Sequence, residues 1–247
     1  MSNFRLPENI GKTMNYLSPN IQNALNQLNL TTPQDIAATG VVKVFLLLKE
    51  LGLTPTKSVL WRLDAFARGV SLGEIDDARK QQLSGCLKAH LPVAIFPSVA
   101  KMQHFMSIAL TEAQKAAQQD EVPVGAVVVC QDKVIAQAHN TAEKDGIAFH
   151  HAELNALTIA AKVCGKSRLC DCDIYITLEP CLMCAGAILH ARIRRLIFAA
   201  YEPKTGVAGS LANIFADKKF NHHTAVLSGV CEKEAQNMLK AFFSVRR

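Results

Sequence analysis

The chain of 247 residues is 49% hydrophobic and 19% charged, with a mean hydropathy of +0.13. This composition suits one large or two ordinary globular domains and excludes an intrinsically disordered chain. The net charge of +6 is spread evenly, because residues 1–96 carry 10 basic and 7 acidic side chains and residues 98–247 carry 17 and 14. Such a mild basic bias is compatible with a polyanionic partner.

The first 90 residues predict a small all-α domain. A hydroxyl residue precedes a proline at positions 18–19 and again at 32–33, as is typical of helix starts. Apolar residues then recur at helical spacing over 41–51 and over 56–68, and a glycine follows each run. We expect Phe45 and Trp61 to lie in the core of this domain.

Pro92 and Pro97 lie in an apolar segment over residues 91–97, which we interpret as a packed connector between two domains. From Ser98 the pattern predicts alternating helices and strands. The expected order is a helix over 98–118, strands over 124–129 and 134–138, a helix from 151, a strand over 174–178, a helix near 181, a strand over 196–200 and a helix over 232–243. This order predicts an α/β domain over 98–247 whose sheet is covered on both faces.

No part of the chain predicts a membrane span. The most apolar stretch, over 41–53, contains Lys43, Lys49 and Glu50, and the first eight residues contain no apolar run. We therefore expect a cytoplasmic protein without a secretory signal. The eight cysteines of such a chain favour metal binding or free thiols over a disulfide framework.

Two short motifs supply the ligands of a metal site. Cys181 and Cys184 are three residues apart, so on a helix both thiols point the same way and can bind one zinc ion. His151 and Glu153 are two apart, which in a regular helix separates them by about 200°. We therefore place His151 at a helix start, as the third ligand, and interpret Glu153 as a general base. Three protein ligands leave the fourth tetrahedral position for a water molecule, as a catalytic zinc requires.

Alternatives to this ligand set remain at this stage. One of Cys164, Cys170 and Cys172 would close a structural zinc site, although packing or free thiols are the more typical roles of such cysteines. His150 is a rival ligand, but it breaks the His-x-Glu spacing, so we expect it in a surface loop.

Residues 98–247 resemble the bacterial tRNA-specific adenosine deaminases along their whole length. His-x-Glu with Pro-Cys-x-x-Cys is the general zinc deaminase pattern, and the further segments are specific for this family. The segments are Glu121-Val-Pro-Val-Gly-Ala126, His151-Ala-Glu153, Thr177-Leu-Glu-Pro-Cys-Leu-Met-Cys-Ala-Gly-Ala187, Lys204-Thr-Gly206 with Gly209-Ser210, and Asn221-His222. Residues 20–85 are more loosely similar to the C-terminal domain of the TfoX competence regulator, through Gly40-Val-Val-Lys-Val-Phe-Leu-Leu-Leu-Lys-Glu and Leu60-Trp-Arg-Leu-Asp-Ala-Phe.

The resemblance implies a cytidine-deaminase-like three-layer domain with a five-stranded mixed sheet, a homodimer and one zinc ion per subunit. It implies conversion of the wobble adenosine of a tRNA anticodon, of an arginine tRNA, to inosine. By this resemblance, His151, Cys181 and Cys184 are the expected zinc ligands and Glu153 is the expected proton shuttle. The expected substrate-binding residues are Asn140, Glu202, Lys204, Asn221, His222 and Arg246. Glu202 stands where relatives often have Asp, and residues 141–150 lack the Pro-Thr that usually precedes the His-x-Glu motif.

Two other functions compete with this one. A deaminase of free guanine, cytidine or deoxycytidylate shares the zinc chemistry but needs no RNA-binding surface, which the basic residues at 192–195, 218–219 and 246–247 indicate here. A catalytically silent, zinc-stabilised RNA-binding module is the second alternative, and the presence of Glu153 argues against it.

Overall fold

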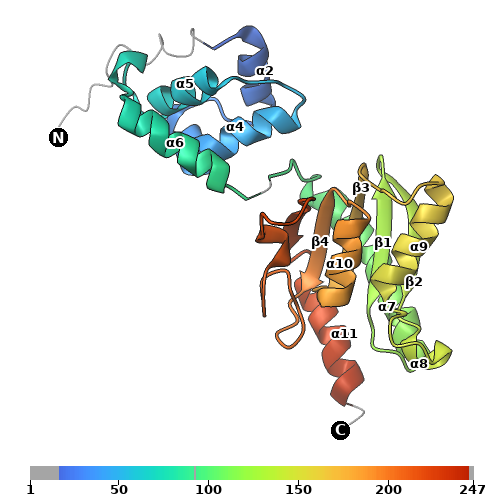
Figure 1. Cartoon of the computed structure of the whole chain (residues 1–247). Coiled ribbons are helices and arrows are strands. Elements are labelled where there is room, and N and C mark those ends of the chain that lie inside the picture. The colour runs from blue at the N-terminus through green and yellow to red at the C-terminus, as the bar shows by residue number, and fades with distance from the viewer. Residues whose placement is uncertain (1–16, 92, 245–247) are drawn as a thin grey trace. The chain divides into compact units, whose positions relative to one another are not determined.

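The computed structural model of the chain describes residues 17–91 and 93–244. These residues form two compact units that divide between Ile95 and Phe96, inside the expected connector. Figure 1 labels the elements of both units. Each unit is described by itself.

The N-terminal unit is helical throughout its described part, as expected. Its helices are α2 (Pro19–Gln27), α3 (Pro33–Thr39), α4 (Val41–Glu50), α5 (Lys57–Arg68), the 3-10 turn η1 (Leu72–Glu74) and α6 (Asp77–Ala89). Thr32 caps α3 through a reciprocal pair of hydrogen bonds with Asp35, whereas the Ser18 side chain makes no capping bond to α2. Both predicted helix starts are therefore confirmed, with Ser18 and Thr32 as N-caps, although only Thr32 caps its helix through a side-chain hydrogen bond.

Aliphatic side chains fill the core of the helical unit. Phe45, Leu48, Leu60 and Leu63 are buried where α4 and α5 pack together. Phe45 is fully buried, and Trp61 is half-buried and packs against this core, so the predicted core position is confirmed for Phe45 and in part for Trp61. Tryptophan is highly buried on average but, because it is large, rarely fully buried.

The C-terminal unit is an α/β domain built on one sheet. Its strands are β1 (Gly125–Cys130), β2 (Lys133–His139), β3 (Cys172–Leu178), β4 (Arg195–Ala200) and β5 (Ala225–Ser228). Its helices are α7 (Val99–Gln118), α8 (Ala142–Asp145), α9 (Ala152–Cys164), α10 (Leu182–His190), the 3-10 turn η2 (Ile214–Ala216) and α11 (Glu232–Ser244). Strand β5 is short and half-buried, and its residues were not predicted as a strand.

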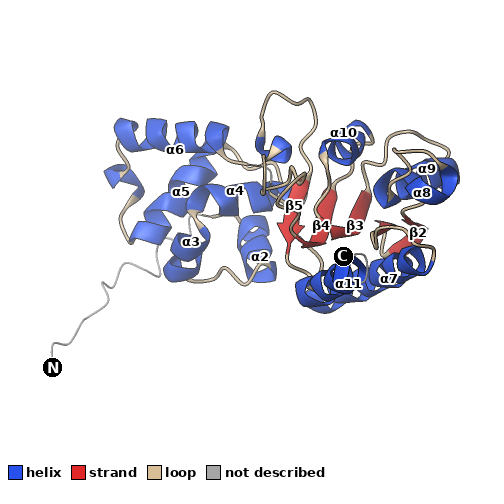
Figure 2. Ribbon diagram, turned by 90° about the horizontal axis from the view of Figure 1, so that it is seen from below, coloured by secondary structure: helices blue, strands red, loops and turns tan. Residues whose placement is uncertain are grey.

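The five strands lie in the order β2-β1-β3-β4-β5. Strand β1 is antiparallel to both β2 and β3, whereas β3, β4 and β5 run parallel, so the sheet is mixed. Figure 2 shows α9 and α10 on one face of this sheet and α7 and α11 on the other. The predicted three-layer fold class, with a five-stranded mixed sheet, is confirmed.

The central strands contribute side chains to a hydrophobic core on each face of the sheet, because successive side chains of a strand point to opposite faces. In β1, Val128 packs under α9 and α10, while Val127 packs under α7 and α11. In β3, Ile174 likewise packs on the face covered by α9 and α10, and Tyr175 on the face covered by α7 and α11. Apolar residues on both faces explain why these strands read as continuous hydrophobic runs.

Helix α7 lies unusually close to the start of β1. A Cβ atom on Gly125 would stand 2.0 Å from the backbone oxygen of Ala109 in α7, so this position requires glycine.

Among the described helices, none is both long and apolar enough to cross a bilayer.

Candidate active site

The ends of two helices bring the three predicted metal ligands together. His151 is the N-cap of α9, Cys181 is the N-cap of α10, and Cys184 lies in the first turn of α10. The Nδ1 atom of His151 lies 3.8 Å from the Cys181 sulfur and 3.5 Å from the Cys184 sulfur. Tetrahedral zinc with ordinary Zn–N and Zn–S bonds requires an edge of about 3.6 Å, so this donor set fits zinc.

Among the described residues, this group is the one set of three or more His, Cys, Asp and Glu side chains whose ligand atoms gather within 4.8 Å of one another. Cys164, Cys170 and Cys172 are free thiols outside it. His150 points its Nδ1 atom to Asp145 at 2.7 Å, in the loop role expected for it.

The electrostatics of the group favour a thiolate at Cys181. The hydrogen bond from the Cys184 thiol, followed by the one from His151, lowers the pKa of Cys181 to about 4 against the opposing effect of burial. The same hydrogen bond and burial raise the pKa of Cys184. The hydrogen bond to Cys181 raises the pKa of His151 despite burial. Both helix N-termini add their positive dipole ends to this stabilisation.

Glu153 lies beside the metal ligands on the first turn of α9 and is only 4% exposed. Burial raises the pKa of its carboxyl to about 7, and the nearby Cys181 thiolate adds to the rise. A carboxyl group that titrates near neutral pH is suited to take up and release a proton in turn.

Asn140 holds the start of α9 in place. Its Oδ1 atom accepts a 2.8 Å hydrogen bond from the Ala152 amide, next to His151, and its Nδ2 atom donates to the Val122 oxygen at 3.1 Å. These bonds use one acceptor site and one N–H donor of a side-chain amide that was expected to contact the substrate base. The structure therefore shows Asn140 as a support of the His151 segment.

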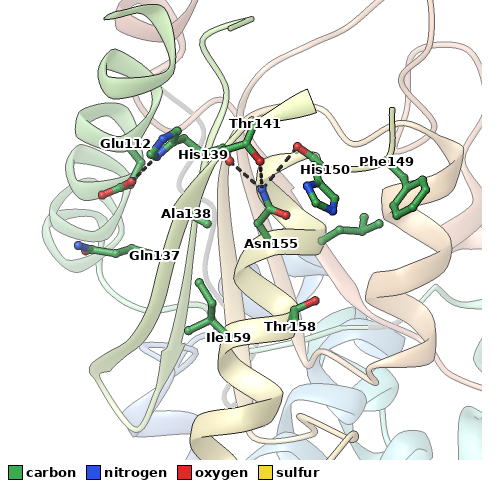
Figure 3. A pocket seen from close by; sticks show the side chains of 11 residues that line it. Glu112, Gln137, Ala138, His139, Thr141, Phe149, His150, Asn155, Thr158 and Ile159 are labelled. Atoms are coloured by element: carbon green, nitrogen blue, oxygen red, sulfur yellow. Dashed lines mark hydrogen bonds and ion pairs between the residues drawn. The ribbon is translucent and has the colours of Figure 1, made fainter. Parts of the chain in front are cut away.

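Residues 141–150, which precede His151 and lack the Pro-Thr usual in the family, are held by hydrogen bonds at both ends of the loop. The Thr141 amide donates to the His150 oxygen at 3.0 Å, and the Lys144 amide donates to the buried carboxylate of Glu121 at 2.8 Å. Figure 3 shows how Asn155 of α9 completes the closure, with its Nδ2 atom 3.0 Å from the His139 oxygen and 3.2 Å from the Thr141 hydroxyl.

An open, mainly apolar depression of about 580 Å³ lies between β2 and α9. Figure 3 shows the side chains that line it. Glu112 and His139 form one wall of it. The buried Glu112 carboxylate lies 2.8 Å from His139 Nδ1 and 2.6 Å from the ammonium group of Lys115, whose side chain is half-exposed. Phe149 and Ile159 line the depression with exposed apolar side chains.

The predicted substrate-binding residues do not all lie together. Glu202 and Lys204 line an open depression of about 720 Å³ against the end of α11. Asn221 and His222 line a different depression, of about 320 Å³, beside α10, where His222 Nε2 lies 2.9 Å from the Ile193 oxygen. Arg246 lies outside the described residues.

A buried carboxylate that the sequence motifs did not single out lies next to the metal ligands. Glu179, 3% exposed, accepts hydrogen bonds from three backbone amides and one hydroxyl of residues 202–210. Burial works to raise the pKa of this carboxyl, but the hydrogen bonds, led by those of Ser210, outweigh it and hold the pKa below its ordinary value. The sequence offered one sign of this role, because Glu179 is a charged residue between the apolar strand over 174–178 and the Pro-Cys of the metal motif.

Comparison with known families assigns a class to this fold and site. Residues 100–247 match the model of the MafB19-like deaminases, and residues 8–87 match that of the TfoX C-terminal domain. Because the first match spans more than half of the chain, the chain belongs to the MafB19-like deaminase family.

Within that class the chain is a relative of the bacterial tRNA-specific adenosine deaminases. It is 44% identical over 139 residues to the tRNA-specific adenosine deaminase of Bacillus subtilis, which covers 56% of this chain and 86% of that protein. It is 42% identical over 149 residues to the Agrobacterium fabrum protein of that name, covering 60% of this chain and 98% of that protein. The predicted resemblance, with its fusion to a TfoX-like domain, is confirmed.

Solved structures agree with this placement. A structure from a study of A-to-I editing by tRNA:A34 deaminases at the wobble position aligns with a TM-score of 0.54 at 43% identity, covering 55% of this chain and 99% of that one. A guanine deaminase from Nitrosomonas europaea shares the fold at 19% identity, with a TM-score of 0.51 and coverage of 63% of this chain and 97% of that one.

Proposed function

We propose that this protein is a zinc-dependent deaminase that converts the wobble adenosine of a tRNA anticodon, in an arginine tRNA, to inosine. The observation that carries the proposal is the gathering of His151, Cys181 and Cys184 around one point with Glu153 beside them. The similarity to tRNA-specific adenosine deaminases over nearly their whole length supports the choice of substrate.

In this proposal His151, Cys181 and Cys184 bind one zinc ion per subunit. Bound zinc supplies a Lewis acid that lowers the pKa of a water molecule toward neutrality. Glu153 would take one proton from the water that attacks C6 and deliver it to N1 of the adenine. It would then pass the second proton of that water, from the new C6 hydroxyl, to the amine as the C6–N bond breaks and ammonia leaves. A carboxyl whose pKa is raised to about 7 by burial is suited to both transfers.

The surface around Lys204 supports an RNA substrate. Tyr201 and Phe243 expose aromatic rings in the same depression as Lys204 and Lys240, which offers stacking surfaces next to positive charge. An adenosine in a single-stranded anticodon loop leaves its stack at little cost, so it can enter a recessed site.

We further propose a homodimer formed through α9 and α10. Ile159 and Val163 are exposed one turn apart on α9, and Leu182 and Met183 are exposed at the start of the neighbouring α10. Val163 is 62% exposed and Leu182 64%, and a partner that covers these aliphatic side chains would remove them from water. Val163→Glu should yield a monomer in sedimentation velocity, whereas Lys162→Glu beside it should leave the dimer intact.

The helical unit has no part in the chemical step of this proposal. The candidate metal ligands and Glu153 all lie in the C-terminal unit. We propose that residues 1–90 form a separate domain that adjusts tRNA or partner engagement, and that the protein acts in the cytoplasm, where tRNA is modified.

One assay tests the activity and separates it from its rivals. The purified protein is incubated with an ACG anticodon stem-loop, with adenosine, with guanine and with cytidine, and products are separated by mass spectrometry. Inosine at the first anticodon position alone supports the proposal. Deamination of a free base or nucleoside alone supports the small-molecule alternative, and zinc with RNA binding but no turnover supports the silent module.

A further inference from the structure

The buried carboxylate of Glu179 connects two segments that are far apart in the sequence. Its Oε1 atom accepts from the Ala208 amide at 2.8 Å and from the Ser210 amide at 3.0 Å. Its Oε2 atom accepts from the Glu202 amide at 3.0 Å and from the Ser210 hydroxyl. All four donors belong to residues 202–210, which we call the substrate loop.

The substrate loop also contacts the metal-binding segment directly. Gly206 forms an isolated bridge with Cys181, and the Val207 amide donates to the Pro180 oxygen at 3.1 Å. A Cβ atom on Gly206 would stand 2.4 Å from the carboxyl carbon of Glu179. The loop therefore lies as close to Glu179 as backbone can, and any side chain at position 206 would push it outward.

Two features argue that this contact is more than packing. A buried carboxylate is costly unless its lone pairs are satisfied, and here four donors from one short segment satisfy them. An apolar residue would fill the same space without this cost, but it would not hold the three amides at fixed positions. The carboxylate thus determines where the loop lies relative to Cys181.

From these contacts we infer that Glu179 is a positioning residue for the substrate. It holds the substrate loop against the metal-binding segment, so that Glu202 and Lys204 lie at a fixed place beside the site. This inference rests on the proposed function, in which Glu202 and Lys204 contact the RNA. Errors of about 1 Å in placing binding groups lower rates by up to about a hundredfold, so we expect the anchor to affect kcat/KM through the placement of Glu202 and Lys204.

The first test is made without substrate. Glu179→Gln keeps the size of the side chain but directs an NH2 group at hydrogen-bond donors. Hydrogen exchange followed by mass spectrometry should show faster exchange of the 202–210 peptide, while the β1 peptide stays protected and zinc remains at one per chain. Glu112→Gln is the matched control, because it alters another buried carboxylate that makes no bond to this loop. Unchanged exchange in Glu179→Gln overturns the inference.

The second test uses a double-mutant cycle on the anticodon stem-loop. Glu179→Gln should lower kcat/KM about 30-fold, mostly through KM, and Lys204→Ala should cost about tenfold in the native background but under twofold in the Glu179→Gln background. Glu112→Gln should leave the cost of Lys204→Ala unchanged. If the costs of Glu179→Gln and Lys204→Ala multiply, Glu179 does not act through the loop and the inference fails.

Ser210→Ala offers a milder variant should Glu179→Gln fold poorly. It removes one of the four donors, so it should speed exchange of the same peptide and raise KM about threefold without changing zinc content. Equal KM and exchange in Ser210→Ala and the native protein overturn the inference. A native protein that deaminates no tRNA overturns the proposed function instead, and the exchange experiment still decides whether Glu179 anchors the loop.

Discussion

The two units of this protein differ most in what they bury. In the described part of the helical unit, the buried side chains are apolar with the exception of Asp64, which Arg79 and Arg68 neutralise. The deaminase unit buries several polar or charged side chains, which are Glu112, Glu121, Asn140, Glu153, Asp173, Thr177, Glu179 and Thr224. Buried polar groups are costly, so their concentration in one unit marks where geometry is held for chemistry and not only for stability.

Within the deaminase unit the buried polar groups serve different purposes. Glu153 faces the metal ligands and carries a raised pKa, which suits proton transfer. Asn140 accepts a backbone amide of α9, Glu121 one of α8 and Glu179 one of the loop after β4, so these three side chains hold segments near the site in place. The comparison predicts that mutations of the first kind abolish catalysis, that those of the second kind weaken it, and that those in the helical unit leave it intact.

Loss of a metal ligand should have the largest effect. Cys184→Ala should contain no zinc, lose activity completely and unfold at a lower temperature, because the bound ion is part of the folded site. Zinc content is measured by plasma mass spectrometry and stability by calorimetry. The control is Cys86→Ala, which changes an exposed cysteine of the helical unit. A Cys184→Ala protein that retains one zinc per chain would refute this ligand set.

Removal of the proton shuttle should come next. Glu153→Gln should keep one zinc per chain and lower kcat by about 10³-fold or more, since general acid–base catalysis contributes about 10² to 10⁴. Single-turnover rates on the stem-loop measure this loss. The control is Asn155→Ala, two residues further along α9, whose single-turnover rate should fall far less than that of Glu153→Gln. A Glu153→Gln variant within tenfold of the native rate contradicts the assigned role.

A buried charge of the helical unit should matter for stability alone. Arg79 donates to both carboxylate oxygens of Asp64, at 2.6 and 3.0 Å. Arg79→Ala leaves that carboxylate buried without its main partner and should destabilise the helical unit by about 3 kcal/mol. Chemical denaturation measures this, and kcat on tRNA should stay within twofold. A parallel loss of kcat would show that the helical unit completes the active site.

The pH dependence of stability should show a contribution from Glu112, which pairs with Lys115 and His139. Burial opposes ionisation of Glu112, but hydrogen bonds from Lys115 and His139 outweigh it and lower the pKa of this carboxyl from 4.5. A lowered folded-state pKa stabilises the protein above about pH 4.5, and this contribution disappears as the pH falls through the folded value. Denaturation from pH 6 to pH 3 should therefore show a shallower loss in Glu112→Gln than in the native protein. Identical slopes would exclude this contribution.

Removal of the helical unit should have the smallest effect on chemistry. A fragment over residues 96–247 keeps Phe96, which packs with Met102 and Phe105 of α7. It should fold, bind one zinc and match the single-turnover rate of the full chain at saturating enzyme within about twofold, because every residue assigned to the chemical step lies within it. A folded, zinc-loaded fragment with a collapsed rate would break the separation between the two units.

Local pattern determined most of the elements and the chemistry of the site. Helical spacing identified α4 and α5, the alternating segment after Ser98 identified four of the five strands, and the two motifs supplied the candidate metal ligands. Each of these depends on residues a few positions apart, whose relation follows from the helix or strand period alone. The fifth strand, β5, was implied only by the family resemblance, because its four residues, one buried and three half-buried, give no clear period.

Only the tertiary structure decided how distant segments support the site. Glu179 and Ser210 are 31 positions apart, and Asn140 reaches Ala152 across a loop. The separation of Asn221 and His222 from Glu202 and Lys204 into two depressions likewise depends on how the chain returns past β4 and α10. No periodicity encodes such pairs, because a buried carboxylate or amide takes whatever donors the packed fold brings to it.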